Sequence, residues 1–322
     1  METTALWHLS ASSTILKTTN IRNDHSVSCL IKSLYSLIST GTERLVAQGK
    51  VPDNLQEAMK VPYMEGSFGF PLTYGYSLVG EVIEGPEHLI GKNVHIMHPH
   101  QSMLYANQAH IAPIPEDIPS KRAVLVSNLE TAVNAVWDSE VTVGEKVLVA
   151  GFGIIGALLC QILRKFPAID LQVLEPNQTR REMARSWGFN VAETITLTEP
   201  SFDVAFNTSS HENGLQFCID SVGYEGKVVE LSWYGDQSVN INLGKSFHHL
   251  RKQIISSQVS QIPGHKLNRW DHQRRKALVF DLLKDPFFDE LLTDEISFQD
   301  SPVFFQDLRN GTIDSIGTTI KY

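Results

Sequence analysis

One stretch decides the fold of this chain: Val147-Leu-Val-Ala-Gly151-Phe-Gly153-Ile-Ile-Gly156. An apolar run leads directly into three glycines with G-x-G-x-x-G spacing, and an apolar helical pattern follows them to Pro167. Gly151 would permit a tight turn, Gly153 would let the backbone approach a ligand, and Gly156 would let strand and helix pack closely. The stretch therefore predicts a strand, a phosphate-binding turn and a helix.

The residues around this turn indicate the ligand. The helix would begin near Ile154 and Ile155, where free N–H groups and the helix dipole attract a pyrophosphate. Glu175 follows the last glycine at about 20 residues, the spacing at which an acid holds the adenosine ribose of a dinucleotide. Such a carboxylate favours NAD over NADP. Arg180 and Arg181 leave NADP open, because an arginine here can instead hold a 2′-phosphate.

Strand and helix patterns alternate around the glycine turn. Strands are predicted at Lys146–Ala150, Leu171–Leu174, Asp203–Phe206 and Lys227–Leu231. Helices are predicted at Lys121–Val136, after the glycines, and at Arg180–Trp187. This alternation is typical of an α/β fold, a doubly wound parallel sheet with helices on both faces.

The flanking regions follow other patterns. Residues 1 to about 120 are β-rich, with short strands expected at Ser28–Tyr35, Gly80–Ile83 and Val94–Met97, and a proline cluster at 113–119 marks a boundary. Near the end, Leu278–Leu283 has a helical pattern and Gly317–Tyr322 fits a closing strand.

Composition narrows the class of protein. The 322 residues are 42% hydrophobic and carry a net charge of −9, which disfavours a nucleic-acid partner. The basic run at 274–276 is expected to be a solvated helix face. Three scattered cysteines and an N-terminus without signal-peptide character predict a reducing, cytoplasmic location. No membrane span is expected.

The motif order resembles the medium-chain dehydrogenase/reductase superfamily of alcohol dehydrogenase-like enzymes. Three stretches carry the resemblance: Ile38-Ser-Thr-Gly-Thr-Glu43, Tyr74-Gly-Tyr-Ser-Leu-Val-Gly-Glu-Val82 and Gly144-Glu-Lys-Val-Leu-Val-Ala-Gly151. The resemblance implies a GroES-like β-barrel catalytic domain at 1–120, a Rossmann NAD(P)-binding domain at 121–265, and a segment at 266–322 that returns to the catalytic domain. The first loop, with the stretches at 130–138 and 232–235, resembles the bacteriochlorophyllide a dehydrogenase-like branch.

The residues expected to bind zinc differ from those of the superfamily. Thr40 stands where zinc members carry a Cys, and Tyr76 stands where they carry a His. Val126–Ser127 falls near the third ligand, and Ser77 replaces a supporting Glu. Hydroxyl groups are poor zinc ligands, so the resemblance implies a zinc-independent member. As an alternative, His95, His98 and His100 could form a metal site if they share one face of a strand.

The resemblance also implies which side chains do the chemistry. Without zinc, a side chain must hydrogen-bond the substrate oxygen and move its proton. Tyr76 is one candidate, or it merely fills the vacated zinc volume. His98 and His100 could act as acid or base, although a structural role is the more frequent one for such histidines. Thr42 matches a hydroxyl that relays protons in zinc members, or holds the turn.

Other polar and aromatic residues are candidates for binding. Asn207 and Ser232 follow predicted strands and could bind the cofactor's ribose or carboxamide. Candidate substrate-pocket residues are Thr40, Glu130, Asn134, Trp233 and Tyr234. The two aromatic residues could instead be plain core, and Glu130 and Asn134 could be helix-start residues without a ligand.

These expectations favour an NAD(P)-dependent, zinc-independent oxidoreductase that acts by hydride transfer on a small-molecule alcohol, ketone or activated alkene. One alternative is a non-catalytic NAD(P)-binding redox sensor or partner subunit, because a fold can outlast its chemistry. Another is a zinc dehydrogenase with an unusual His site. The resemblance further implies a homodimer.

Overall fold

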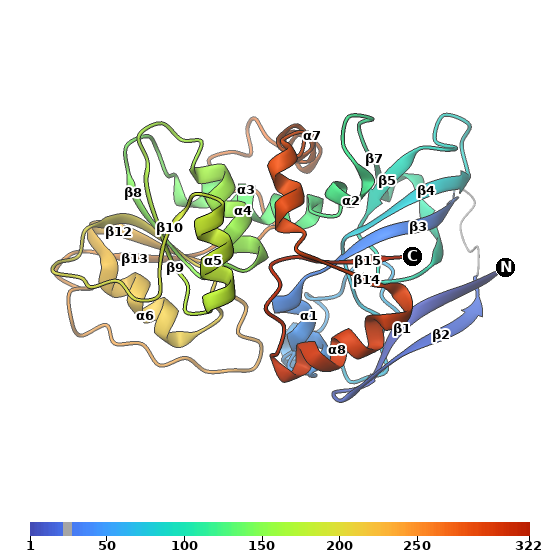
Figure 1. The fold of residues 1–322 in the computed structure, drawn as a ribbon, viewed down its shortest axis with the longest axis horizontal. Coiled ribbons are helices and arrows are strands. Elements are labelled where there is room, and N and C mark those ends of the chain that lie inside the picture. Colours follow the sequence, from blue (N-terminus) through green and yellow to red (C-terminus); the bar gives the residue numbers. More distant parts are fainter. Residues whose placement is uncertain (22–27) are drawn as a thin grey trace. The chain divides into compact units, whose positions relative to one another are not determined.

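The computed structural model describes residues 1–21 and 28–322, and the chain forms two compact units (Figure 1). The first unit comprises residues 1–127, 280–313 and 317–322, and the second comprises residues 128–279 and 314–316. Their divisions fall after residues 127 and 279, whereas the sequence analysis placed them after 120 and 265. No helix in the described ranges combines the length and apolar character needed to cross a bilayer.

The second unit is built on a six-stranded parallel sheet. Its strands are β8 (Lys146–Ala150), β9 (Asp170–Leu174), β10 (Asn190–Ala192), β11 (Phe202–Asn207), β12 (Val222–Glu230) and β13 (Gln253–Ser256). They lie in the order β10-β9-β8-β11-β12-β13. This is the doubly wound order of a Rossmann sheet, so the predicted fold class is confirmed. The strand order reverses between β8 and β11, and ligands of such sheets bind beyond the carboxyl ends at that point.

Three helices connect strands of this sheet: α4 (Ile154–Leu163), α5 (Gln178–Ser186) and α6 (Glu212–Ser221). In contrast, α3 (Val126–Ser139) precedes its first strand and α7 (His272–Leu282) follows its last. α4 follows β8 through the glycine turn and is buried on nearly every side, with Ile155 and Ile162 only partly exposed. A cluster of buried residues including Leu148, Ala205 and Leu215 joins β8, β11 and α6 in the core of this unit.

The first unit is a β-structure with a few short helices. Its strands are β1 (Glu2–Ser10), β2 (Ser13–Asn20), β3 (Ser28–Ile38), β4 (Leu78–Glu84), β5 (Asn93–Ile96), β6 (Met103–Asn107), β7 (Ile111–Pro113), β14 (Asp294–Ser297) and β15 (Thr318–Lys321). β1 and β2 form a hairpin, and the rest form a sheet in the order β14-β15-β3-β4-β5-β7, with β6 on β3. Its helices are α1 (Thr40–Ala47), α2 (Ser120–Ala123) and α8 (Ser301–Asn310), with 3₁₀ turns at Asp53–Leu55, Gln108–His110, Pro286–Leu291 and Phe298–Asp300.

The C-terminal segment completes the first unit. β15 pairs antiparallel with β3 and parallel with β14. Ile320 of β15 and Phe305 of α8 share one buried cluster with Leu6 of β1 and Ile38 of β3. Because these apolar side chains come from both ends of the sequence, burying them brings the last strand back into the first unit.

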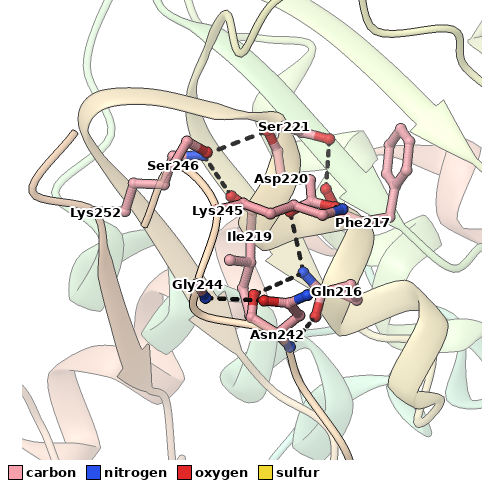
Figure 2. A network of polar contacts seen from close by, with 10 residues as sticks. All are labelled: Gln216, Phe217, Ile219, Asp220, Ser221, Asn242, Gly244, Lys245, Ser246 and Lys252. Carbon is pink, nitrogen blue, oxygen red and sulfur yellow. Dashed lines mark hydrogen bonds and ion pairs between the residues drawn. The ribbon is translucent and has the colours of Figure 1, made fainter. Parts of the chain in front are cut away.

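A buried lysine closes the end of α6 in the second unit (Figure 2). The Lys252 ammonium donates to the carbonyl oxygens of Ile219 and Asp220 at 2.7 and 3.3 Å, and it lies 2.7 Å from the Ser246 hydroxyl. Burial lowers the pKa of Lys252, because desolvation disfavours the charged ammonium. The contacts satisfy carbonyl groups that the last helical turn cannot pair within itself.

Replacing Lys252 with methionine is expected to cost about 1–3 kcal/mol of stability, because the buried carbonyl oxygens lose their donor. Urea unfolding followed by circular dichroism measures this. The matched control is Lys245→Met: Lys245 pairs with Asp220 at 2.9 Å, but its side chain is 60% exposed. An exposed pair is worth less than about 1 kcal/mol. Equal losses in the two variants would contradict the capping role of Lys252.

Candidate functional site

The glycine turn has the geometry that its sequence predicts. Gly151 has φ +98°, and a Cβ there would lie 2.9 Å from the Thr208 hydroxyl oxygen. A Cβ on Gly156 would lie 2.1 Å from the carbonyl oxygen of Gly151, so the helix can approach the turn only without a side chain. At Gly153, the nearest atom to a Cβ would be a guanidinium nitrogen of Arg180 at 3.9 Å. Packing therefore requires glycine at positions 151 and 156, whereas Gly153 faces space that a phosphate group could enter.

Glu175 stands directly after β9, beside this turn. Its carboxylate accepts the backbone N–H of Phe152 at 2.6 Å and that of Asn177 at 2.8 Å. The side chain is almost fully buried. A carboxylate has about four acceptor sites, so two remain for ribose hydroxyls after these bonds. The position fits the predicted role of Glu175, which stays a prediction.

The arginines that left NADP open are both held by the protein. Arg180 donates to the backbone carbonyl oxygens of Asp314 and Ser315 at 3.1 and 3.3 Å. Arg181 donates to the carbonyl oxygen of Glu175 at 3.0 Å and to the Glu193 carboxylate at 3.0 Å. Both guanidinium groups are therefore held by protein oxygens without an anionic ligand. Their geometry gives no support to the binding of the 2′-phosphate of NADP.

Asn207 ends β11 and is fully buried. Its amide nitrogen donates to the Glu230 carboxylate at 2.8 Å and to the Tyr234 hydroxyl at 3.0 Å. Its amide oxygen accepts the backbone N–H and the hydroxyl of Ser209 at 3.2 and 2.7 Å. All four hydrogen-bonding positions of the Asn207 amide are therefore used within the protein.

Glu230, the last residue of β12, was missed by the sequence analysis. Besides Asn207, it accepts the backbone N–H of Ser232 at 2.7 Å and the hydroxyl of Tyr234 at 3.2 Å. Burial raises its pKa, and these hydrogen bonds act in the opposite direction. Burial also raises the pKa of Tyr234. Trp233 is partly exposed. The sequence signal that could have indicated Glu230 was an acidic residue near the end of a predicted apolar strand.

Glu130 and Asn134 belong to a buried ionic network on α3. Glu130 lies 3.3 Å from the Arg275 guanidinium and 3.1 Å from the Lys276 ammonium, and Asn134 accepts from Arg275 at 2.8 Å. Arg275 is only 4% exposed. The prediction that the basic run at 274–276 is a solvated face is thus wrong for Arg275, because its charge is compensated inside the unit. Substrate contact by Glu130 or Asn134 stays a prediction.

In the first unit, the positions of the expected zinc ligands carry hydroxyl and apolar groups. Thr40 begins α1, Tyr76 precedes β4, and Val126–Ser127 begins α3. The Ser127 hydroxyl donates to the carbonyl oxygen of Tyr76 at 2.8 Å. Within residues 1–21 and 28–322, no group of three or more His, Cys, Asp or Glu side chains could hold a metal ion. This donor set does not fit the zinc of the superfamily.

The three histidines do not share one face of a strand, as the metal alternative requires. β5 ends at Ile96, so His98 and His100 lie beyond it. The two nitrogens of His100 lie 2.9 Å from the Glu43 carboxylate and 2.8 Å from the Ser36 hydroxyl. His95 lies 3.1 Å from the Ser77 hydroxyl. The alternative gains no support, because both ring nitrogens of His100 contact protein groups and the three histidines do not share a strand face.

Glu43 connects several candidate residues and was also missed by the sequence analysis. It is buried, accepts the backbone N–H of Ser39 at 2.7 Å, and pairs with His100. Burial and then the charge of Glu43 raise the pKa of Tyr76 to about 12, while hydrogen bonds with Ser39 and Thr42 act in the opposite direction. Tyr76 is therefore a neutral phenol at physiological pH and can donate a hydrogen bond.

His98 is a buried histidine with a fixed tautomer. Its Nδ1 lies 2.8 Å from the carbonyl oxygen of Pro99, which can only accept, so Nδ1 carries the proton and Nε2 the lone pair. The Tyr63 ring stacks on it with centroids 5.1 Å apart. Burial, and to a smaller extent the charge of His100, lower the pKa of His98 to about 4. Its Nε2 is thus a hydrogen-bond acceptor at neutral pH.

Comparisons with known proteins agree with this architecture. No family model matches the chain. D-guloside 3-dehydrogenase of Escherichia coli (strain K12) is 24% identical over 248 residues, which span 71% of this chain and 71% of that protein. Acetophenone reductase from Geotrichum candidum, in complex with NAD, has a TM-score of 0.80 at 16% identity, covering 100% of this chain and 97% of that one. S. aureus TarJ, in complex with NADPH, has a TM-score of 0.74 at 16% identity, covering 100% and 99%.

Together, the fold and these relatives define the class. The chain's curated relatives and solved structural neighbours are alcohol dehydrogenase-like enzymes of the medium-chain dehydrogenase/reductase type, which supports the resemblance seen in the sequence. The named dehydrogenases among these relatives and neighbours support an alcohol dehydrogenase-like oxidoreductase. Its placement in the bacteriochlorophyllide a dehydrogenase-like branch stays a prediction.

Proposed function

We propose that this protein is an NAD(P)-dependent, zinc-independent oxidoreductase that transfers a hydride to or from an alcohol, a ketone or an activated alkene. One observation carries the proposal: a doubly wound sheet holds the open Gly153 turn at its switch point, with the buried Glu175 carboxylate beside that turn. Its relatives include several dehydrogenases, and the solved neighbours include complexes with NAD and NADPH.

The second unit carries the groups that would hold the cofactor. The backbone around Gly153, Ile154 and Ile155 would bind the pyrophosphate at the start of α4, and Glu175 would accept hydrogen bonds from the adenosine ribose. When bound, the nicotinamide ring supplies the chemistry of hydride transfer. Because Glu175 is a carboxylate and Arg180 binds Asp314 and Ser315, we expect NAD to bind more tightly than NADP.

Two side chains of the first unit suit the proton chemistry. Tyr76 can donate a hydrogen bond to a carbonyl oxygen, because its raised pKa of about 12 keeps the phenol protonated. His98 can accept a proton or hydrogen bond at Nε2, because Pro99 fixes its tautomer. With a pKa of about 4, His98 is neutral above that pH and loses its acceptor as the pH falls through that value. Thr42 would assist through its hydrogen bond with Tyr76.

Zinc independence rests on the donor set. The hydroxyls of Thr40 and Tyr76 and the apolar Val126 stand at positions where zinc needs thiolate, imidazole or carboxylate. Metal analysis of protein purified without chelator tests this part of the proposal. Stoichiometric zinc that activity requires would overturn it.

Cofactor titration and turnover together test the function. We expect calorimetry to detect NAD or NADH binding, and a panel of carbonyl and quinone substrates to reveal NADH consumption. Loss of the expected zinc ligands also favours a second function, a redox sensor or partner subunit. That alternative predicts tight cofactor binding with no turnover on any member of the panel. Absence of cofactor binding would contradict both functions.

Replacing Tyr76 with phenylalanine is expected to lower kcat about 100-fold, because a positioned donor near the reacting oxygen is lost. The affinity for NADH should change little, since the cofactor-binding groups lie in the other unit. Steady-state kinetics and fluorescence titration measure the two effects. Tyr224→Phe is the matched control, because Tyr224 is 66% exposed. An unchanged kcat in Tyr76→Phe would remove Tyr76 from the mechanism.

A further inference from the structure

The two halves of the parallel sheet carry equivalent acids at their carboxyl ends. The strand order places β8, β9 and β10 on one side of the switch point and β11, β12 and β13 on the other. β9 is thus the second strand of the first half, and β12 is the second strand of the other half. Glu175 directly follows β9, and Glu230 is the last residue of β12. The acids differ by one position in register.

The two carboxylates are also held in the same way. One oxygen of each accepts the backbone N–H of the residue two positions later, Asn177 for Glu175 and Ser232 for Glu230. The other oxygen accepts a donor from the neighbouring strand's end. For Glu175 this donor is the backbone N–H of Phe152 after β8, and for Glu230 it is the amide of Asn207 at the end of β11. The second half therefore repeats the arrangement of the first.

A Rossmann sheet binds one mononucleotide on each half. The first half takes the adenosine part, where an acid after the second strand holds the ribose. From the repeated arrangement we infer that Glu230 binds the hydroxyls of the nicotinamide ribose, as Glu175 would bind those of the adenosine ribose. This inference rests on the proposed cofactor binding and adds a contact that determines affinity for the nicotinamide half.

The surroundings of Glu230 fit this role better than those of Asn207. Glu230 is partly exposed, whereas Asn207 is fully buried with its amide satisfied inside the protein. Glu230 accepts hydrogen bonds from Asn207, Tyr234 and the backbone N–H of Ser232. The Ser232 hydroxyl also interacts with the carboxylate, so a ligand hydroxyl would take the place of that hydroxyl at the fourth acceptor site. Asn207 and Tyr234 thus act as positioning residues that fix the carboxylate.

Calorimetry with NAD and with ADP distinguishes binding of the nicotinamide part from binding of the adenosine part, because ADP contains only the adenosine part. Glu230→Gln is expected to weaken NAD binding about 10- to 100-fold, the value of a hydrogen bond to a charged group, and to leave ADP binding unchanged. Glu175→Gln should weaken both ligands. Glu225→Gln is the control, because Glu225 lies in the same strand and forms a half-exposed pair with Arg251 at 2.7 Å.

The outcomes are distinct. Retained ADP affinity shows that the Glu230 variant is folded, and Glu230→Asp, which withdraws the carboxylate by one methylene, provides a second folded variant with the same expected loss for NAD. If either variant weakens NAD and ADP equally, or leaves both unchanged, the inference about Glu230 is overturned. If the unmodified protein binds neither NAD nor ADP, the proposed function itself fails.

Discussion

Replacing Gly156 with alanine is expected to abolish measurable NAD binding and to destabilise the second unit by about 3 kcal/mol or more. The added Cβ would lie 2.1 Å from the carbonyl oxygen of Gly151, 3.0 Å from its carbonyl carbon and 2.9 Å from the Thr208 hydroxyl oxygen. The first two atoms belong to the backbone and cannot rotate away. α4 would therefore have to move from β8, and the turn between them would lose its shape.

Calorimetry with NAD and thermal unfolding check this result. Gly223→Ala is the matched control in the same unit, because a Cβ on Gly223 would approach no atom closer than 3.6 Å and would meet only ordinary contacts. That variant should bind NAD as the unmodified protein does. Normal NAD affinity in Gly156→Ala would show that a side chain at position 156 does not disturb the turn, and the prediction would be wrong.

Replacing Arg275 with methionine is expected to cost about 3–5 kcal/mol, because one partner of a buried ionic network is removed. The Glu130 carboxylate would keep Lys276 alone, and the carbonyl oxygen of Val259, now 2.7 Å from the guanidinium, would lose its donor. Asn134 would lose its 2.8 Å contact as well. A buried carboxylate that keeps only one of its two cationic partners is less stable than one with both.

The neighbouring arginine provides the control for this prediction. Arg274 is exposed, and its guanidinium lies 4.1 Å from the centroid of the Trp270 ring. Arg274→Met should therefore cost about 1 kcal/mol or less. Urea unfolding compares the two variants, and Arg275→Met combined with Glu130→Leu should recover part of the loss. Similar losses in both single variants would show that the network does not stabilise the unit.

The Rossmann sheet could be predicted because its signals are local. The glycine spacing, the apolar runs before and after it and Glu175 all lie within about 30 residues, the length of one strand–helix–strand repeat. The predicted strand at Lys146–Ala150 matches β8, and that at Leu171–Leu174 lies within β9. β10 and β13 are short and give no clear periodicity, so they were not predicted.

The missed site residues depend on contacts between distant positions. Glu43 and His100 lie 57 positions apart, and Ser36 lies 64 positions from His100. No local pattern indicates that such residues meet. Arg275 appeared to be a surface residue because its partner Glu130 lies 145 positions earlier. Glu230 was included in a predicted strand, but the sequence alone does not show that β12 corresponds to β9 across the sheet.

The pairing of β15 with β3 also bears on the order in which the protein is completed during translation. The Ser36 and Tyr322 hydroxyls, 2.9 Å apart, belong to residues 286 positions apart in the chain. A ribosome must therefore synthesise residues 128–279 before the last residues of β3, Tyr35–Ile38, can pair with β15. Pairing over such a separation is slow, since a long loop has to close first. The nascent polypeptide can thus complete the parallel sheet of the second unit while the end of β3 still lacks its β15 partner.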